Sequence, residues 1–175
     1  MPCLRRNILL HTQSTEVRPC EDTPSSTEVG SFREDLTQEI CSECALKVYL
    51  AVPLISNRSI ERTRMMAKAI ADSGHVVASP WNLDPSEVAT PSAVNVFERD
   101  RMGSENCDIM VADVTHPSTG VGMEVMAAYN AGRRIILVAR KGRLVSKMLE
   151  DMDGKEWLRY DVETEIYPGL FKLLN

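Results

Sequence analysis

From residue 47 onward, short apolar runs alternate along the chain with segments in which apolar residues recur every three or four positions. The short runs predict buried β-strands, and the periodic segments predict amphipathic helices. The expected strands are 47–52, 75–79, 108–114, 134–139 and 157–160, and the expected helices are 59–72, 91–102, 123–131, 145–151 and 163–174. This alternation is typical of repeated βαβ units that form a parallel sheet.

Right-handed crossovers leave few ways to order these parallel strands. The simplest is a flavodoxin-like (Rossmann-type) α/β fold with five strands in the order 2-1-3-4-5 and helices on both faces of the sheet. Ligands of such folds bind beyond the carboxyl ends of the strands, where the order reverses between the first and third strands. The loops 53–58 and 115–122 are expected to meet there.

Two residues mark expected helix starts. Ser59 suits an N-cap, because its side chain can accept a hydrogen bond from a free backbone N–H. Pro91 is expected in the first turn of the second helix, where its fixed φ fits and its missing N–H is not needed. The apolar residues Val94, Val96 and Phe97 of that helix fit either the core or an interface.

Residues 1–45 differ sharply in composition from the rest. They contain clusters of Thr, Ser, Pro and Glu, no sustained hydrophobic period, and 8 acidic against 4 basic residues. Such a segment buries too little apolar surface to offset its ordering entropy, so we expect a disordered, polar and acidic leader. Residues 46–175 form the expected folded domain, with 17 acidic and 16 basic residues, so most of the net charge of −5 belongs to the leader.

The composition of the 175-residue chain argues against several classes of protein. No stretch reaches the ~18 consecutive apolar residues that a membrane span needs. The acidic balance argues against an extended surface for nucleic-acid polymers. The cysteines number five, an odd count, with four in the first 45 residues, which favours a reducing, cytoplasmic setting. Cys41 and Cys44 lack a second close pair, so we expect no zinc site.

The loop after the third expected strand has the composition of an anion site. Ser118, Gly120 and Gly122 are small, so backbone amides at the start of the next helix can approach an anion. The same pattern also fits a plain strand-to-helix connection. Glu124 follows one turn into the helix, where we expect the helix dipole to keep its carboxylate ionised, as a nucleophile or base requires. Alternatively, Glu124 only complements the dipole of the first turn.

A second carboxylate, that of Asp100, belongs to the helix before the third strand. Alone it fits a solvated helix residue. Paired with Glu124 across the crevice, it supplies the two carboxylates that cleavage of a glycosidic bond needs. Tyr49, in the first expected strand, can orient a carboxylate through its hydroxyl group, or it is simply a core residue.

Four segments carry a resemblance to a known family: 47–51 (KVYLA), 98–100 (ERD), 108–114 (DIMVADV) and 117–124 (PSTGVGME). Together they resemble the nucleoside 2-deoxyribosyltransferase superfamily. The sequence is most similar to the 2′-deoxynucleoside 5′-phosphate N-hydrolases, whose loop reads Pro-Ser-x-Gly-Val-Gly-x-Glu. The likeness spans about residues 47–174, so it implies that residues 46–175 form a catalytic domain of this kind.

The resemblance implies a role for each residue that matches the family motif. Glu124 matches the nucleophilic glutamate that forms a covalent deoxyribosyl intermediate, and Asp100 matches the aspartate that positions the sugar and protonates the departing base. Tyr49 matches the tyrosine that orients the nucleophile. Ser118 stands where the transferases carry an aspartate and the hydrolases a serine, and a hydroxyl group can bind a 5′-phosphate that a carboxylate would repel.

Other matches concern the phosphate and the base. Ser146 matches a hydrolase serine that reaches the phosphate from the neighbouring subunit, which implies a homodimer with a composite active site. Arg58 stands where an arginine is expected, although its loop lacks the Gly-rich run of the animal hydrolases. It is a candidate cation for the phosphate, or merely an exposed first-turn arginine. Trp81 and His116 are candidates for contact with the base.

The resemblance therefore implies an enzyme, an N-glycosidase that hydrolyses 2′-deoxynucleoside 5′-monophosphates to the free base and deoxyribose 5-phosphate. No metal or organic cofactor is expected, and the partner is a small nucleotide rather than a nucleic-acid polymer or a membrane. Two alternatives stay open. One is a nucleoside 2-deoxyribosyltransferase that exchanges bases, and the other is a non-catalytic nucleotide-binding module, because a fold alone does not settle function.

Overall fold

The computed structural model describes residues 45–55, 58–87, 89–91, 93 and 95–175. The expected leader, apart from Ala45, lies outside these residues, and so does the pair of Cys41 and Cys44.

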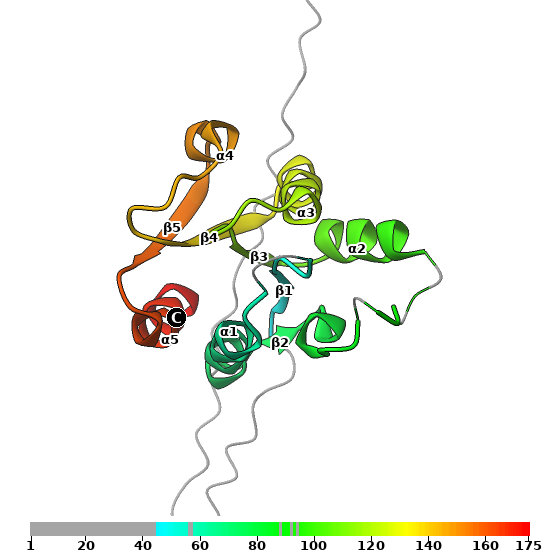
Figure 1. The fold of residues 1–175 in the computed structure, drawn as a ribbon, viewed down its shortest axis with the longest axis horizontal. Helices are drawn as coiled ribbons and strands as arrows, with labels where there is room; N and C mark the ends of the chain where they lie inside the picture. The colour runs from blue at the N-terminus through cyan, green and yellow to red at the C-terminus, as the bar shows by residue number, and fades with distance from the viewer. Residues whose placement is uncertain (1–44, 56–57, 88, 92, 94) are drawn as a thin grey trace, which may run out of the picture. The chain divides into compact units, whose positions relative to one another are not determined.

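Five parallel strands form one sheet in the order β2-β1-β3-β4-β5 (Figure 1). The strands are β1 Lys47–Ala51, β2 Val76–Val77, β3 Ile109–Asp113, β4 Arg134–Arg140 and β5 Lys155–Tyr160. This arrangement confirms the expected flavodoxin-like order, although β2 is shorter than the predicted 75–79. Because β1 and β3 are parallel neighbours, their C-terminal ends lie side by side.

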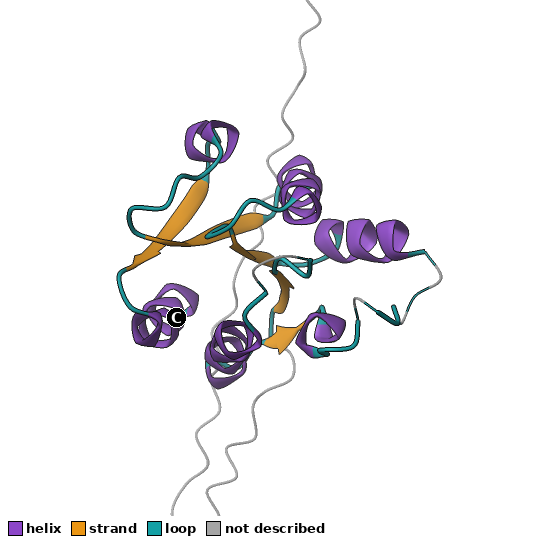
Figure 2. Cartoon of the chain, in the orientation of Figure 1, coloured by secondary structure: helices purple, strands orange, loops and turns teal. Residues whose placement is uncertain are grey.

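Helices cover both faces of the sheet, with α1 and α5 on one face and α2, α3 and α4 on the other (Figure 2). The helices are α1 Ile60–Asp72, α2 Val96–Glu105, α3 Thr119–Asn130, α4 Lys147–Asp151 and α5 Ile166–Leu174, with 3-10 helices η1 Pro80–Leu83 and η2 Glu163–Glu165. No helix in the described part of the chain is both long and apolar enough to cross a membrane.

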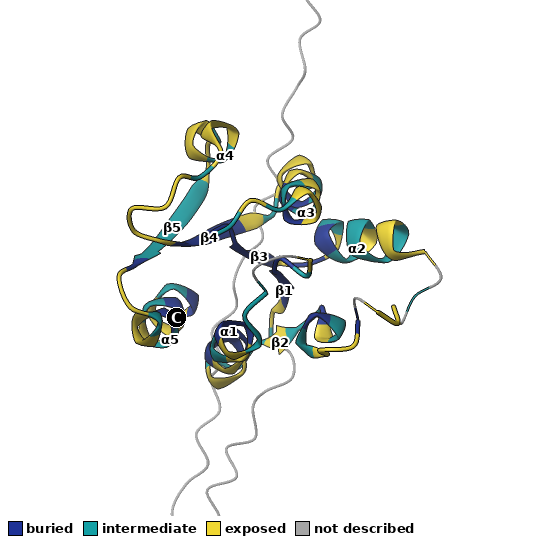
Figure 3. Ribbon diagram, in the orientation of Figure 1, coloured by how far each residue is buried: buried dark blue, intermediate teal, exposed yellow. Residues whose placement is uncertain are grey.

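Alternate residues of the central strands face two separate cores. Val48 and Leu50 pack into the core beneath α1 and α5, whereas Tyr49 and Ala51 pack into the core beneath α3. This follows from the two-residue period of a strand. The central strands are buried on both faces, as their dark blue colour in Figure 3 shows. The strand pleat therefore directs Tyr49 towards the α2 and α3 side of the sheet.

The second helix begins later than expected. α2 starts at Val96, and its N-cap is Asn95, whose side chain accepts a backbone N–H of the first turn at 3.0 Å. Pro91 lies in irregular backbone. The asparagine side chain satisfies a helix N–H group, which fixes the start more strongly than a suitable φ angle alone. Val96 and Phe97 are exposed, Phe97 to 57%, so the core alternative was wrong for both, and Val94 lies outside the described residues.

Candidate active site

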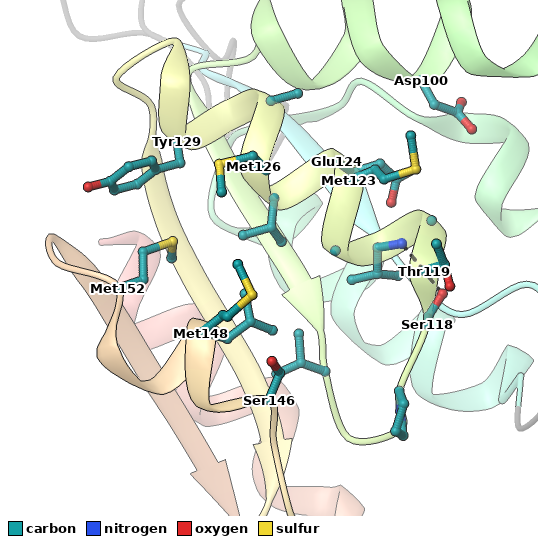
Figure 4. Close-up of a pocket in the computed structure, with 18 of the residues that line it drawn as sticks. Asp100, Ser118, Thr119, Met123, Glu124, Met126, Tyr129, Ser146, Met148 and Met152 are labelled. Atoms are coloured by element: carbon teal, nitrogen blue, oxygen red, sulfur yellow. Dashed lines mark hydrogen bonds between the residues drawn. The ribbon is translucent and has the colours of Figure 1, made fainter.

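A cavity of about 1500 Å³ opens beside the N-terminal end of α3 (Figure 4). Its walls come from α2, from residues within 116–130, which include most residues of α3, and from residues within 144–152. The expected site residues that line it are Asp100, Ser118, Gly120, Gly122, Glu124 and Ser146. The cavity thus gathers most of the site that the sequence suggested.

A hydrogen bond joins the first strand to the third helix at the edge of this cavity. The hydroxyl group of Tyr49 donates to Glu124 Oε1 at 2.9 Å, and the Tyr49 ring is fully buried. The expected pairing of these residues is thereby present in the structure. Glu124 does not merely complement the first-turn dipole: Ser118 is the N-cap of α3, so Glu124 lies in the second turn.

The environment of Glu124 favours its neutral form more than the helix dipole alone predicts. Burial raises the pKa of Glu124 from its ordinary 4.5 to about 7, and the charge of Asp100 raises it further, whereas the Tyr49 hydrogen bond and the charge of Arg99 lower it. The expectation that the helix dipole keeps this group ionised did not take burial into account, which is the largest influence on its pKa. Burial, followed by the charges of Glu124 and Asp100, also raises the pKa of Tyr49, which stays a neutral hydrogen-bond donor.

Asp100 is not a solvated helix residue. It lies on α2, its side chain is only 16% exposed, and its Oδ1 accepts a hydrogen bond of 2.7 Å from Arg99 Nε. Its charge acts on both Tyr49 and Glu124. Because α2 packs against α3, the structure brings two carboxylates from different helices to one side of the cavity.

The start of α3 forms a small-residue rim on the cavity. Ser118 Oγ accepts a hydrogen bond from Val121 N at 3.4 Å, and helix α3 begins at Thr119 rather than at the expected residue 123. Gly120 and Gly122 lie within the helix. A Cβ atom at Gly122 would meet nothing within 4 Å, and one at Gly120 would meet only Ser118 Oγ, at 4.0 Å. Neither glycine is therefore required by packing within the described chain, and both leave open space beside the cavity.

Arg58 holds a neighbouring segment of backbone. Its guanidinium group donates to the carbonyl groups of Asn82 at 3.0 Å, Asp84 at 2.6 Å and Pro85 at 3.4 Å. These bonds tie the first loop to the end of η1. Contact between Arg58 and a phosphate group stays a prediction.

Ser146 lies on the far side of the cavity from the two carboxylates. It is exposed, and it precedes the short helix α4 (Figure 4). His116 also lines the cavity. The structure therefore does not bring Ser146 to Asp100 and Glu124 of its own chain, and the expected role across a subunit boundary stays a prediction.

Trp81 packs behind the site. Its ring lies edge-to-face with Tyr49, with centroids 6.2 Å apart, and the guanidinium group of Arg99 lies 4.4 Å from its centroid. Arg99 also donates to Glu87, a buried carboxylate. The sequence reasoning overlooked Arg99 and Glu87. Arg99 could have been found from its position next to Asp100, but no local pattern marks Glu87 as buried.

Metal-binding geometry is absent from the described part of the chain, which contains no group of three or more His, Cys, Asp or Glu side chains that could hold a metal ion. The residues near the cavity are instead two carboxylates, a tyrosine and hydroxyl groups. Such a set supports acid, base and nucleophilic chemistry.

Comparison with solved structures supports the fold. A CMP N-glycosidase of Clostridium botulinum superimposes with a TM-score of 0.51 at 21% identity, over 73% of this chain and 97% of that one. At this identity the likeness establishes the fold alone.

Comparison of sequences supports the family. This chain is 36% identical over 106 residues to a Thermofilum pendens protein assigned as 2′-deoxynucleoside 5′-phosphate N-hydrolase 1. The aligned region covers 58% of this chain and 73% of that one. It is 32% identical over 113 residues to the 5-hydroxymethyl-dUMP N-hydrolase of Mus musculus, covering 62% of this chain and 63% of that one. A family profile described as nucleoside 2-deoxyribosyltransferase matches residues 48–162. The chain therefore belongs to the nucleoside 2-deoxyribosyltransferase family.

Proposed function

We propose that this protein hydrolyses the N-glycosidic bond of 2′-deoxynucleoside 5′-monophosphates and releases the free base and 2-deoxyribose 5-phosphate. The observation that carries the proposal is the hydrogen bond between Tyr49 and Glu124 beside Asp100, in a cavity that begins at a helix N-terminus. Two relatives are named as hydrolases of this class of bond, which supports the same assignment.

In the first step, Glu124 attacks C1′ of the sugar. Tyr49 donates to Oε1, so Oε2 is left to form the new bond to C1′. The bond between C1′ and the base nitrogen breaks with its electron pair on the nitrogen. Asp100 enters this step protonated on Oδ2, since Oδ1 accepts from Arg99, and it supplies the proton that the departing base takes up. Positive charge develops on the sugar ring in this transition state, and the adjacent carboxylate stabilises it.

In the second step, water attacks C1′ and the bond to Glu124 breaks. Asp100 accepts the proton that the water loses, which returns both carboxylates to their starting states. The net reaction consumes one water molecule. No metal or organic cofactor takes part in this scheme.

The phosphate is proposed to bind at the start of α3. Ser118 offers a hydroxyl group where a carboxylate would repel a dianion, and Gly120 and Gly122 leave the surface open. Contacts to a phosphate lie far from C1′, so their binding energy serves to orient the sugar for attack. Monophosphates are therefore expected to react far better than nucleosides.

A second copy of the chain is proposed to complete the site. Six large apolar side chains that line the cavity are exposed: Phe97, Met123, Met126, Tyr129, Leu144 and Met148. Single exposed apolar residues are common on protein surfaces, whereas a group of them in one place marks an interface. In the proposed homodimer, Ser146 of one copy reaches the phosphate in the other. Mass and activity measured together during dilution test this, because activity should fall as the dimer dissociates.

A reducing, cytoplasmic setting is part of the same proposal. In the described part of the chain the one cysteine, Cys107, is a buried free thiol.

Transfer of deoxyribose between bases is the second candidate function, which the description of the matching family profile favours. Addition of a second free base to the reaction separates the two activities. Formation of an exchanged nucleoside or nucleotide faster than hydrolysis would make transfer the main reaction.

A further inference from the structure

A second layer of side chains supports Asp100 from behind, and Arg99 is its centre. The Arg99 side chain is 13% exposed, and its Nε donates to Asp100 Oδ1 at 2.7 Å. Its Nη1 donates to Glu87, whose side chain is 3% exposed. The guanidinium plane lies over the Trp81 ring, 4.4 Å from the centroid. Three contacts from three different residues therefore fix one cation.

We infer that Arg99 is a positioning residue for the proposed reaction, which holds the Asp100 carboxylate in place and is itself held by Glu87 and Trp81. This inference rests on the proposed function. A guanidinium group suits the task because it is planar, always charged, and donates in several fixed directions at once. With Oδ1 occupied by Arg99, Oδ2 of Asp100 is the oxygen left for the substrate.

The same layer reaches Tyr49. Trp81, in the segment 80–87, lies edge-to-face with the Tyr49 ring and also packs against Arg99. It therefore contacts both the residue that bonds to Glu124 and the residue that bonds to Asp100. Arg58 ties the backbone of this segment at Asn82, Asp84 and Pro85. The segment therefore supports both Tyr49 and Arg99 through Trp81.

The electrostatics agree with this geometry. The titratable and charged groups that act on Glu124 are Tyr49 from β1 and Arg99 and Asp100 from α2. Of these, Arg99 is the cation, and its charge lowers the pKa of Glu124 against the effect of burial. A hydrogen bond that served only to join two segments of the chain would not require a positively charged donor near Glu124.

Other arginines of the chain provide a comparison. Arg134, at the N-terminal end of β4, pairs with Glu156 at 2.7 Å. That pair is exposed, neither residue lines the cavity, and Arg134 also donates to the backbone carbonyl group of Leu173 on α5. Exposed pairs contribute little to stability, so Arg134→Gln is a matched control for loss of an arginine–glutamate pair.

The test compares base release by Arg99→Gln, Arg99→Lys and Arg134→Gln from a monophosphate that the wild-type enzyme cleaves. We expect Arg99→Gln to lower kcat by about 10- to 100-fold, because a small misplacement of a reacting group has effects of this size. We expect the acidic limb of the pH profile of kcat/KM for Arg99→Gln to move to higher pH. Arg99→Lys keeps the charge, so its acidic limb should stay near that of the wild type while kcat still falls. Arg134→Gln should match the wild type in both.

A wild-type kcat and pH profile in folded Arg99→Gln would overturn the inference. If Arg99→Gln does not fold, Glu87→Gln keeps the cation and tests the same contact. Glu87→Gln should lower kcat. Adding Arg99→Lys to Glu87→Gln should lower kcat by a smaller factor than Arg99→Lys does in the wild-type protein. Effects that simply add, or no effect of Glu87→Gln, would contradict the inference. Absence of base release by the wild-type protein from every monophosphate would instead refute the proposed function.

Discussion

Tyr49 and Glu124 lie 75 residues apart in the chain, yet the Tyr49 hydroxyl group donates a 2.9 Å hydrogen bond to Glu124 Oε1. The bond joins the first strand to the second turn of α3. It lowers the pKa of a carboxyl group that burial raises to about 7. Tyr49 therefore provides orientation for Glu124 and also helps it to ionise.

The pH dependence of activity follows from this balance. A nucleophilic Glu124 must be ionised, so kcat/KM should rise with pH and level off above the pKa of about 7. Tyr49→Phe removes a hydrogen bond that lowers this pKa, so its acidic limb should move to higher pH and its kcat should fall by at least about tenfold.

Tyr160→Phe serves as the control for these measurements. The Tyr160 hydroxyl group is also buried and shares a hydrogen bond with Thr115 Oγ1 at 3.1 Å, outside the carboxylate pair. We expect a similar loss of stability without a shift of the acidic limb. If kcat/KM of the wild type fell as pH rose through 7, Glu124 would be acting as an acid, against the proposed mechanism.

The raised pKa of Glu124 also affects stability. The folded state holds this proton more tightly than the unfolded chain does, so the contribution of the group is full below about pH 4.5 and is lost as pH rises through about 7. Glu124→Gln removes the ionised form. It should raise the free energy of unfolding at about pH 8 by up to about 3 kcal/mol and have little effect near pH 4.5.

Denaturant unfolding at the two pH values measures this difference. Glu156→Gln, which alters an exposed pair with Arg134, is the matched control and should show no such pH-dependent gain. An equal effect of Glu124→Gln at both pH values would show that burial does not raise the pKa of Glu124.

Gly103 on α2 lets the helix approach the Tyr49 ring. A Cβ atom at position 103 would lie 2.6 Å from Tyr49 Cε2, closer than packing allows. Gly103→Ala must therefore displace either the ring or α2, which carries Asp100. We expect a loss of roughly 1–3 kcal/mol in stability together with a drop of at least about tenfold in kcat.

Gly169→Ala is the control for this substitution. Gly169 is in α5, does not line the cavity, and a Cβ atom there would lie 2.5 Å from Cδ1 of Leu158 on β5. It should lose a similar amount of stability and keep its kcat. Equal losses of kcat in the two variants would mean that crowding acts on activity only through global stability.

Gly122 tests the proposed phosphate site. It lies inside α3 with free space around it, so alanine there should leave the fold intact and stabilise the helix by up to about 1 kcal/mol. The methyl group would, however, occupy the rim where the phosphate is proposed to bind. We expect KM for a monophosphate to rise and the weak reaction of the matching nucleoside to change little. Equal changes for both substrates would argue against a phosphate at this rim.

The sequence predicted the sheet well because buried parallel strands give continuous apolar runs. Right-handed crossovers then left few strand orders, of which 2-1-3-4-5 was the simplest. Helix starts were less predictable, since Asn95 rather than Pro91 fixes the start of α2. Pairing of Tyr49 with Glu124 was expected from the family resemblance. The pKa of Glu124 was not, because it depends on burial, which no local pattern records.

The central claim is that Glu124 cleaves the N-glycosidic bond of a 2′-deoxynucleoside 5′-monophosphate. The most direct measurement is chromatographic detection of free base from a panel of nucleotides, deoxynucleotides and nucleosides, with the wild type and Glu124→Ala. We expect release of base and deoxyribose 5-phosphate from at least one deoxynucleoside monophosphate, poor reaction of its nucleoside, and a loss of several orders of magnitude in Glu124→Ala. Equal efficiency for the nucleoside and its monophosphate, or turnover that survives in Glu124→Ala, would contradict the claim.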